Sequence, residues 1–438
     1  GDGAPRDPSV FVYELPAALN SDLVAAYVAT YGVDPTDDSQ PHGRCAGWDA
    51  DCIKAANHRK AETAQYSADI ALHRALLAHP SRVYNSSAAD LLYVPWYNYL
   101  SSGLDHTLNL LDNFTFGSAT FQSQTVLLAA TLLNSSEFLR RPERHILPAV
   151  SWYKAAETIR DLAQMSGRFS SMIKLAVDPY LFNMSTHNLE FINTDHHNFF
   201  DKHGLALGYN DHELPGMQRV VEWTVDRLRR ERFVAVPYVP STSLAMMATL
   251  PDPSERTLTA AFHGNTQLDA CKGFDREHPG GPGWAPWSET IDSCQLRVNL
   301  VSALGDPYYA NFSVGDGSVG DSSKAAPSVY SSRGVYVESM LQSKFCLSPR
   351  GDTPSSRRLF DAIMAGCVPV LIADDLVLPY ASQLDWSSFT LRHAEVDAVH
   401  NVEGLALRLQ QVGEDEYRKL YANLLRARAA LNFTAEGG

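Results

Sequence analysis

The chain has 438 residues, with 36 Lys and Arg against 50 Asp and Glu, which gives a formal net charge of −14. A hydrophobic content of 45% with 27 Gly and 24 Pro is ordinary for a globular protein and excludes a disordered, fibrous or coiled-coil chain. The acidic balance argues against nucleic acid as a partner, because sequence-independent binding to it depends on Lys and Arg. At about 150 residues per domain, the length predicts two to three domains.

Strand-like and helix-like segments alternate along the chain, and this alternation predicts an α/β fold with mostly parallel sheets. The first half has two predicted strands, Ser9–Leu15 and Asp90–Trp96. It also has two predicted helices, Ala61–Ala78 and Gln218–Glu231. The longest apolar runs are shorter than the ~20 residues that a bilayer requires, so no transmembrane helix is predicted.

The pattern restarts after a Pro-containing stretch, and we place a domain boundary near residue 240, between domains 1–240 and 241–438. The second domain has three predicted strands and a predicted helix, which are Thr257–His263, Lys344–Leu347, Val368–Ala373 and Glu403–Gln411. Two stretches rich in Gly, Pro or Ser, 273–289 and 305–334, are expected to be long loops.

The segment Lys344–Asp375 has the features of an anion-binding site. Its predicted strand leads through a turn into a helix over residues 357–365, with Ser355 and Ser356 where an N-cap belongs. Gly366 follows the helix as a good C-terminal cap. Leu359, Phe360, Ile363 and Met364 form an apolar stripe, and the Arg and Asp residues of the helix lie on the opposite side.

The start of this helix suits a diphosphate, because backbone N–H groups, Ser hydroxyls and Arg side chains converge there. Asp361, one turn further along, is placed to accept hydrogen bonds from a ribose diol. In the alternative interpretation this is a surface helix whose Arg and Asp pair only with each other. The predicted nucleotide-binding residues are Arg350, Gly351, Ser355, Ser356, Arg357, Arg358 and Asp361.

Two features indicate the secretory pathway: N-x-Ser/Thr sequons and an even cysteine count, six. The sequons, which we expect to carry glycans, are at Asn85, Asn113, Asn134, Asn183, Asn311 and Asn432. The close pairs Cys45–Cys52 and Cys271–Cys294 are predicted disulfides. Cys346–Cys367, at the starts of adjacent predicted strands, fits either a third bond or two packed thiols. The alternative is a cytosolic protein with free thiols and chance sequons.

No metal site is predicted. Asp49 and Asp51 form an acidic pair between two cysteines, where a solvated turn is the simpler interpretation. His187, His197 and His203 match no standard pattern of ligand spacing.

Residues 345–370, FCLSPRGDTPSSRRLFDAIMAGCVPV, together with the following LPY closely resemble the exostosin-like family, glycosyltransferase family 47, in its plant and algal form. Phe11–Pro16 resembles the family's opening strand, Ala89–Tyr97 its ADFFVPFY segment and Phe262–Gly264 its FFRG element. Ser348 stands where many plant members have a second Cys. Extra residues lie between Asn183 and Asp195, in the segment that resembles the family's central region.

The resemblance implies a GT-B fold, in which two Rossmann-like domains face each other across a cleft. It assigns the acceptor to the N-terminal domain and the nucleotide sugar to the C-terminal one, where Gly264 joins the donor-binding residues. The last helix can pack back on the N-terminal domain. The implied reaction is an inverting transfer from a nucleotide sugar, UDP-linked, to a hydroxyl of a cell-wall polysaccharide or glycoprotein glycan. No metal or other cofactor is required.

The resemblance also implies a type II membrane protein of the Golgi lumen, with its anchor upstream of this sequence, and leaves open a homo- or heterodimer. The candidates for the base that deprotonates the acceptor are Asp195 and His196; a core or loop His without a chemical role is the alternative. Trp96 and Tyr97 offer aromatic faces to an acceptor sugar, and ordinary packing is their alternative role. The competing function is a non-catalytic, glycan-binding subunit of a Golgi glycosyltransferase complex.

Overall fold

The computed structural model describes residues 7–31, 68–101, 117–150, 155–177, 232–240, 242–245, 247–264, 266, 293–316, 331–351, 354–374 and 376–432. The chain divides into two compact units. The first comprises Gly1–Ile192, Val225–Thr242 and Glu436–Gly438, and the second comprises Asn193–Thr224 and Ser243–Ala435.

The first unit is built on a six-stranded sheet in the order β2-β1-β3-β4-β5-β6, in which every neighbouring pair is parallel. Its strands are β1 (Val10–Val12), β2 (Arg82–Val83), β3 (Leu91–Tyr93), β4 (His145–Pro148), β5 (Ile173–Ala176) and β6 (Phe233–Ala235). Its described helices are η1 (Ala17–Leu19), α1 (Ser21–Tyr31), α3 (Ala68–Ala78), η2 (Ser86–Ala88), α5 (Gly117–Leu133), α6 (Ser136–Arg140), η3 (Pro142–Arg144), α7 (Ala155–Met165) and η4 (Gly167–Ser171).

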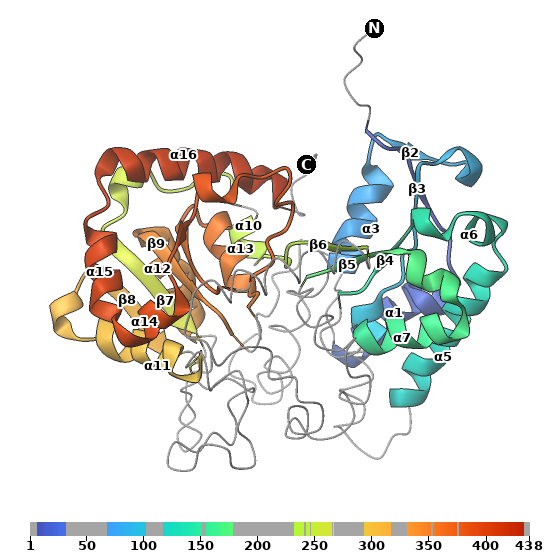
Figure 1. The fold of residues 1–438 in the computed structure, drawn as a ribbon, viewed down its shortest axis with the longest axis horizontal. Coiled ribbons are helices and arrows are strands. Elements are labelled where there is room, and N and C mark those ends of the chain that lie inside the picture. Colours follow the sequence, from blue (N-terminus) through green and yellow to red (C-terminus); the bar gives the residue numbers. More distant parts are fainter. Residues whose placement is uncertain are drawn as a thin grey trace, which may run out of the picture. The chain divides into compact units, whose positions relative to one another are not determined.

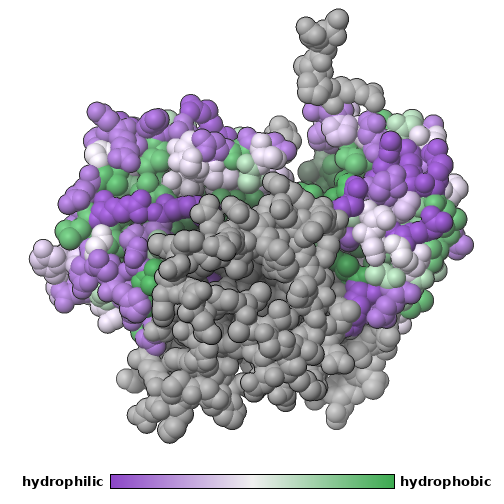
Figure 2. All heavy atoms as spheres, viewed as in Figure 1, coloured by the Kyte–Doolittle hydropathy of each residue, from purple (hydrophilic) through white to green (hydrophobic). Residues whose placement is uncertain are grey.

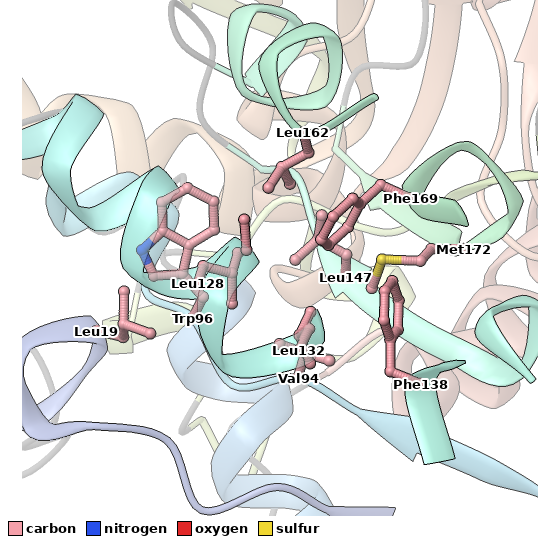
Figure 3. Close-up of a cluster of buried hydrophobic side chains, with 11 residues drawn as sticks. Leu19, Val94, Trp96, Leu128, Leu132, Phe138, Leu147, Leu162, Phe169 and Met172 are labelled. Atoms are coloured by element: carbon pink, nitrogen blue, oxygen red, sulfur yellow. The ribbon is translucent and has the colours of Figure 1, made fainter. Parts of the chain in front are cut away.

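Both faces of this sheet are covered, as expected for a parallel sheet. On one face a buried cluster joins the strands to α5, α6 and α7 (Figure 3). On the other face Val10, Val12 and Tyr93 pack with Leu72 and Leu76 of α3. Because successive residues of a strand point to opposite faces, the short apolar strands supply both cores.

The second unit is built on a five-stranded parallel sheet in the order β11-β10-β9-β7-β8. Its strands are β7 (Leu258–Gly264), β8 (Phe312–Asp316), β9 (Ser343–Pro349), β10 (Val368–Ile372) and β11 (Leu391–Arg392). The helices after the first unit's last strand are α10 (Thr242–Ala245), η5 (Pro253–Glu255), α11 (Ser293–Leu304), η8 (Pro307–Tyr309), α12 (Ser331–Gln342), α13 (Arg357–Met364), η9 (Trp386–Ser388), α14 (Glu395–His400), α15 (Val402–Gln410) and α16 (Glu414–Ala430).

The helices of the second unit form two groups around its sheet (Figure 1). In one group, α11, α14 and α15 pack on one another, and α11 and α15 contact β8 and β7. In the other, α12 packs on β7 and β9, while α13 packs on β9, β10 and α16. The last helix, α16, thus packs on elements of its own unit.

Much of the described secondary structure follows the sequence prediction, but one predicted loop does not. The stretch 305–334 contains η8, the whole of β8 and the start of α12. The Gly and Ser content suggested a loop, whereas β8 is stabilised by its parallel pairing with β7, a partner about 50 residues away. The other predicted loop, 273–289, and the predicted helix Gln218–Glu231 lie outside the described residues.

On the face seen in Figure 2, hydrophilic residues predominate over the described surface, with smaller hydrophobic areas between them. In the described part of the chain, no helix combines the length and the apolar character needed to cross a membrane. Two parallel sheets covered by helices confirm the predicted α/β class, with two Rossmann-like domains as in a GT-B fold.

Candidate functional site

The order of strands in the second unit marks one edge of its sheet as a candidate site. The chain runs from β7 outwards to β8 and then returns through α12 to β9, which pairs with the other side of β7. Open α/β sheets bind ligands beyond the carboxyl ends of the strands at such a reversal. The carboxyl ends of β7 and β9, and the start of α13 that follows β9, therefore form the candidate site.

The sequence determines both ends of α13. Ser356 is its N-cap, and the side chain of Ser356 accepts a hydrogen bond from the backbone N–H of Arg358 at 3.3 Å, which confirms the predicted cap. Gly366 adopts φ of +67°, as a residue just beyond a helix end commonly does. Gly351, Ser355 and Ser356 are partly exposed, so a ligand can reach the first turn.

Arg358 is the residue that most distinguishes this site. Its side chain is only 9% exposed, and its guanidinium carbon lies 4.7 Å from the ring centre of Phe262 and 5.3 Å from that of Tyr336. Within the described part of the chain, Nε and Nη1 have no hydrogen-bond partner. Burial lowers the pKa of this guanidinium, and among the described residues two of its three nitrogens lack an acceptor. Such a group fits an anionic ligand.

Arg357, its neighbour, has a different environment. Its Nε lies 3.4 Å from Oδ2 of Asp361, and the same carboxylate accepts a hydrogen bond from the Tyr336 hydroxyl at 2.9 Å. Asp361 is fully buried. A ribose would have to displace Tyr336 to reach this oxygen. The side of α13 opposite the apolar stripe is covered as well, because residues 358–364 are all buried.

Arg350, from the turn after β9, is directed at a different acidic residue. Its side chain is 4% exposed and its Nη1 lies 3.5 Å from Oε1 of Glu395, which is fully buried at the start of α14. Glu395 also accepts a hydrogen bond from the backbone N–H of Asp374, and Arg297 of α11 donates to the Arg350 carbonyl at 2.8 Å. Arg350 therefore joins β9, β10, α11 and α14 beneath the candidate site.

Gly264, the last residue of β7, is placed against Arg358. A Cβ at this position would collide with Nη2 of Arg358 and would come within 3.3 Å of the Phe262 ring. Only glycine lets the guanidinium lie over the end of β7. The structure thus brings Gly264, Arg357, Arg358, Ser356 and the neighbouring residues of the turn together.

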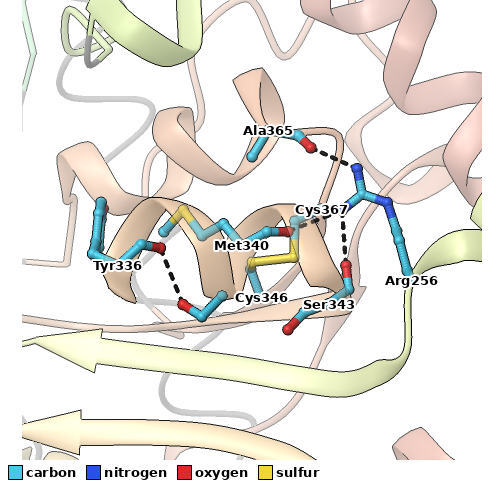
Figure 4. The surroundings of a disulfide bond; sticks show 8 residues. Arg256, Tyr336, Met340, Ser343, Cys346, Ala365 and Cys367 are labelled. Carbon is cyan, nitrogen blue, oxygen red and sulfur yellow. Dashed lines mark hydrogen bonds between the residues drawn. A yellow bond between two sulfur atoms is a disulfide. The ribbon is translucent and has the colours of Figure 1, made fainter. Parts of the chain in front are cut away.

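A disulfide and an arginine hold the elements around α13 (Figure 4). Cys346 of β9 and Cys367, just before β10, form a bond with their Cα atoms 5.7 Å apart. Arg256 donates hydrogen bonds to the carbonyls of Met340, Ser343 and Ala365 at 2.9, 2.9 and 2.6 Å. The third predicted pair is therefore a disulfide; for the pairs Cys45–Cys52 and Cys271–Cys294, the side chains lie outside the described residues.

The aromatic residues predicted to meet an acceptor lie in the core of the first unit. Trp96 is fully buried within the cluster of Figure 3. Tyr97 is 7% exposed, and its hydroxyl lies 2.8 Å from Nδ1 of His73. Asp69, on the same helix as His73, is fully buried, and burial raises its pKa to about 7. In the described structure both aromatic rings are packed in the core, which was their alternative role.

The predicted base candidates, Asp195 and His196, lie outside the described residues, as do two of the sequons, Asn113 and Asn183. Asn85 and Asn134 are exposed. The two remaining sequon side chains bond to protein. Nδ2 of Asn311 donates to Oγ1 of Thr259 at 2.6 Å, and Nδ2 of Asn432 donates to the carbonyl of Ala245 at 2.9 Å.

Sequence reasoning missed the residues that surround α13: Phe262, Tyr336, Arg297 and Glu395. Phe262 and Tyr336 come from β7 and α12, and Glu395 begins α14. No local pattern marks these residues, because their roles depend on contacts across 25 to 100 positions of the chain. Only the FHG element at the end of β7 carried a signal, and it pointed to Gly264 alone.

Comparison with known proteins gives the family. Residues 190–406 match the model of the exostosin GT47 domain. A probable glucuronosyltransferase of Oryza sativa subsp. japonica is 24% identical over 392 residues, which cover 89% of this chain and 66% of that protein.

Two shorter matches have higher sequence identity. A second probable glucuronosyltransferase of the same rice is 48% identical, and a probable β-1,4-xylosyltransferase of Arabidopsis thaliana is 47% identical, each over 63 residues. Those 63 residues cover 14% of this chain and 15% of either relative. The matches thus span less than two thirds of these relatives. With its exostosin GT47 domain, the chain belongs to the exostosin-like glycosyltransferases of family 47.

Proposed function

We propose that the second unit binds the diphosphate of a nucleotide sugar, UDP-linked, at the start of α13. The chain then transfers the sugar, with inversion, to a hydroxyl of a cell-wall polysaccharide or glycoprotein glycan. The observation that carries this proposal is Arg358: a guanidinium only 9% exposed, with two nitrogens that lack a described acceptor, beside a capped helix N-terminus at the reversal of strand order. The names of the relatives, glucuronosyltransferase and xylosyltransferase, support sugar transfer.

The charges of the site support a diphosphate in particular. A buried guanidinium is costly unless an acceptor compensates it, and hydrogen bonds between charged groups stabilise by about 1.5–3 kcal/mol each. The N–H groups at the start of α13 add a partial positive charge on the same side. Together these groups offset the charge that develops on a leaving diphosphate, so we propose that transfer needs no metal ion.

The donor site is tested by thermal unfolding with UDP in the presence of EDTA. A ligand at a hundredfold excess over its Kd stabilises by about 2.7 kcal/mol, which gives a clear rise in Tm. Arg358→Ala should lose most of this rise. Its stability without ligand is measured alongside, because the substitution removes both a buried cation, two of whose nitrogens lack a described acceptor, and its packing on Phe262 and Tyr336.

The matched control is Arg418→Ala, which removes an exposed arginine of α16 in the same unit. This variant should respond to UDP as the wild type does. A full UDP response in Arg358→Ala would show that the donor site lies elsewhere.

We further propose that Asp195 is the base that deprotonates the acceptor hydroxyl, with His196 as the second candidate. Support comes from the Asp-His pair in the segment that resembles the family's central region. Replacing the base should lower kcat by about 10²–10⁴ and leave the UDP response intact, because a base acts only in the transition state. An Asp base keeps working in mildly acidic solution, whereas a His base loses activity below about pH 6.5.

The measurement is the turnover of Asp195→Asn and His196→Ala at saturating donor. Near-normal rates in both variants would place the base elsewhere. Product detection with the wild type also tests the competing function: a UDP response without turnover of any glycan acceptor would favour a non-catalytic, glycan-binding subunit.

A further inference from the structure

His263 lies next to the proposed diphosphate site but takes no part in the argument above. It is the penultimate residue of β7, directly before Gly264, whose position Arg358 covers. Its Nε2 lies 2.9 Å from Oγ of Ser313 on β8. A Cβ on Gly315 would come within 2.7 Å of Nδ1 and 3.1 Å of Cε1, so this edge of the imidazole lies close to the backbone near the carboxyl end of β8. Residues from β7 and β8 thus fix the ring.

The surroundings of His263 favour the neutral imidazole when no ligand is bound. Burial, followed by the positive charge of Arg358, lowers the pKa of His263 to about 4. From β8 the ring meets the uncharged Ser313 hydroxyl, and from α13 it faces Arg358. From α12, Tyr336 contacts Arg358 and donates a hydrogen bond from its hydroxyl to Asp361. Among the described residues, Arg358 is the charged group that shifts the pKa of His263.

We propose that His263 takes up a proton from solvent when a diphosphate binds beside Arg358, and that the imidazolium then becomes a second cation of the donor site. The inference rests on the proposed function and deepens it, because it makes donor binding depend on pH. The protonated ring of His263 would raise the affinity for negatively charged diphosphates relative to that for neutral nucleosides.

Binding of a diphosphate opposes the two effects that lower the pKa of His263, which are burial and the charge of Arg358. A bound diphosphate compensates the charge of Arg358 and adds negative charge of its own, and both changes favour the protonated ring. Protonation costs no hydrogen bond, because the Ser313 hydroxyl can donate to a neutral ring nitrogen and can accept from an N–H. By linkage, a group whose pKa rises on binding makes affinity fall as pH increases between the free and the bound pKa values.

The test is calorimetric titration with UDP from pH 5 to 8, in pairs of buffers that differ in ionisation enthalpy. For each UDP bound, the wild type should take up about 0.5 to 1 proton more than His263→Gln does. Its affinity should also fall more steeply with pH, by up to about tenfold per pH unit. The titration of UDP itself cancels in the comparison. His263→Arg, which carries a permanent cation, should bind UDP without this additional pH dependence.

The matched control is His393→Gln. His393 is in the same unit and also lies beside an arginine, with its Nδ1 3.3 Å from Nη1 of Arg408. This variant should behave as the wild type does. Histidine side-chain NMR of the wild type gives an independent reading that needs no variant, since the ring nitrogens of His263 should report protonation on addition of UDP.

Two negative results are distinguishable. If the wild type and His263→Gln bind UDP with the same proton uptake and pH dependence, or if NMR finds the ring neutral with UDP bound, the inference on His263 is wrong and the donor site stands. If the wild type does not bind UDP at all, the proposed donor site fails and the inference fails with it.

Discussion

His145 is held in one neutral tautomer by the atoms at its two ring nitrogens. Nδ1 lies 3.1 Å from the carbonyl oxygen of Arg141, so Nδ1 must carry the proton that the carbonyl accepts. Nε2 lies 2.8 Å from the Tyr13 hydroxyl and therefore accepts a hydrogen bond from it. The Tyr13 oxygen can then accept from Ser135, 2.9 Å away. A second proton, on Nε2, would reverse the donors along this chain, so that the Tyr13 hydroxyl accepts from His145 and donates to Ser135.

The fully buried ring makes the stability of the first unit sensitive to acid. Burial lowers the pKa of His145 to about 4, against about 6.5 when the chain is unfolded. Between these values the unfolded chain binds the proton and the folded one does not, so stability is lost as pH falls from about 6.5 to 4. The difference amounts to about 3 kcal/mol at most.

The measurement is urea unfolding of the wild type and His145→Asn at pH 7, 5.5 and 4.5. The variant should be less stable at pH 7 but should lose less stability on acidification. His73, whose pKa burial also lowers to about 4, is present in both proteins and cancels in the comparison. Equal losses in the two proteins would contradict the prediction.

At the scale of elements, the carboxyl end of α13 is fixed by groups from far along the chain. Arg256 donates to the last carbonyls around α12 and α13, and its guanidinium carbon lies 5.5 Å from the ring centre of Tyr421 on α16. A Cβ on Gly366 would come within 2.8 Å of Nη2 of Arg256. The turn after α13 therefore requires glycine both for its positive φ and for this close approach.

The ends of α13 could be predicted because caps and strand pairing are encoded locally. Ser356 and Gly366 mark the helix, and the continuous apolar run after it marks β10 as a buried parallel strand. The sequence could not distinguish Arg357 from Arg358, which are neighbours of the same type. Only the packing of Tyr336 and Phe262 pairs one with Asp361 and leaves the other without a described acceptor.

At the scale of the whole molecule, the alternation of segments was enough to predict two parallel α/β units. Several strands were too short to predict, since β2 and β11 have two residues each and show no period. These two strands are stabilised by parallel pairing with β1 and β10, respectively. The resemblance to the family was dense in one motif, residues 345–370.

The last prediction concerns the compartment in which the whole chain folds. We propose the lumen of the secretory pathway. Chain secreted from a eukaryotic host should carry glycans at Asn85 and Asn134, which are exposed. Asn311 should be unoccupied in folded protein, because its Nδ2 donates to Thr259 and the sequon's Ser313 hydroxyl is bonded to His263. The folded chain thus holds both polar groups of this sequon in hydrogen bonds.

Glycopeptide mass spectrometry after enzymatic deglycosylation in heavy-oxygen water measures occupancy at each site. Asn311→Gln provides the matched control and should secrete as the wild type does, whereas Asn85→Gln should remove one glycan from the intact mass. Occupancy at Asn311 comparable to that at Asn85 would contradict the reading of this surface. Bare Asn85 and Asn134 together would contradict the luminal proposal, since both side chains are exposed.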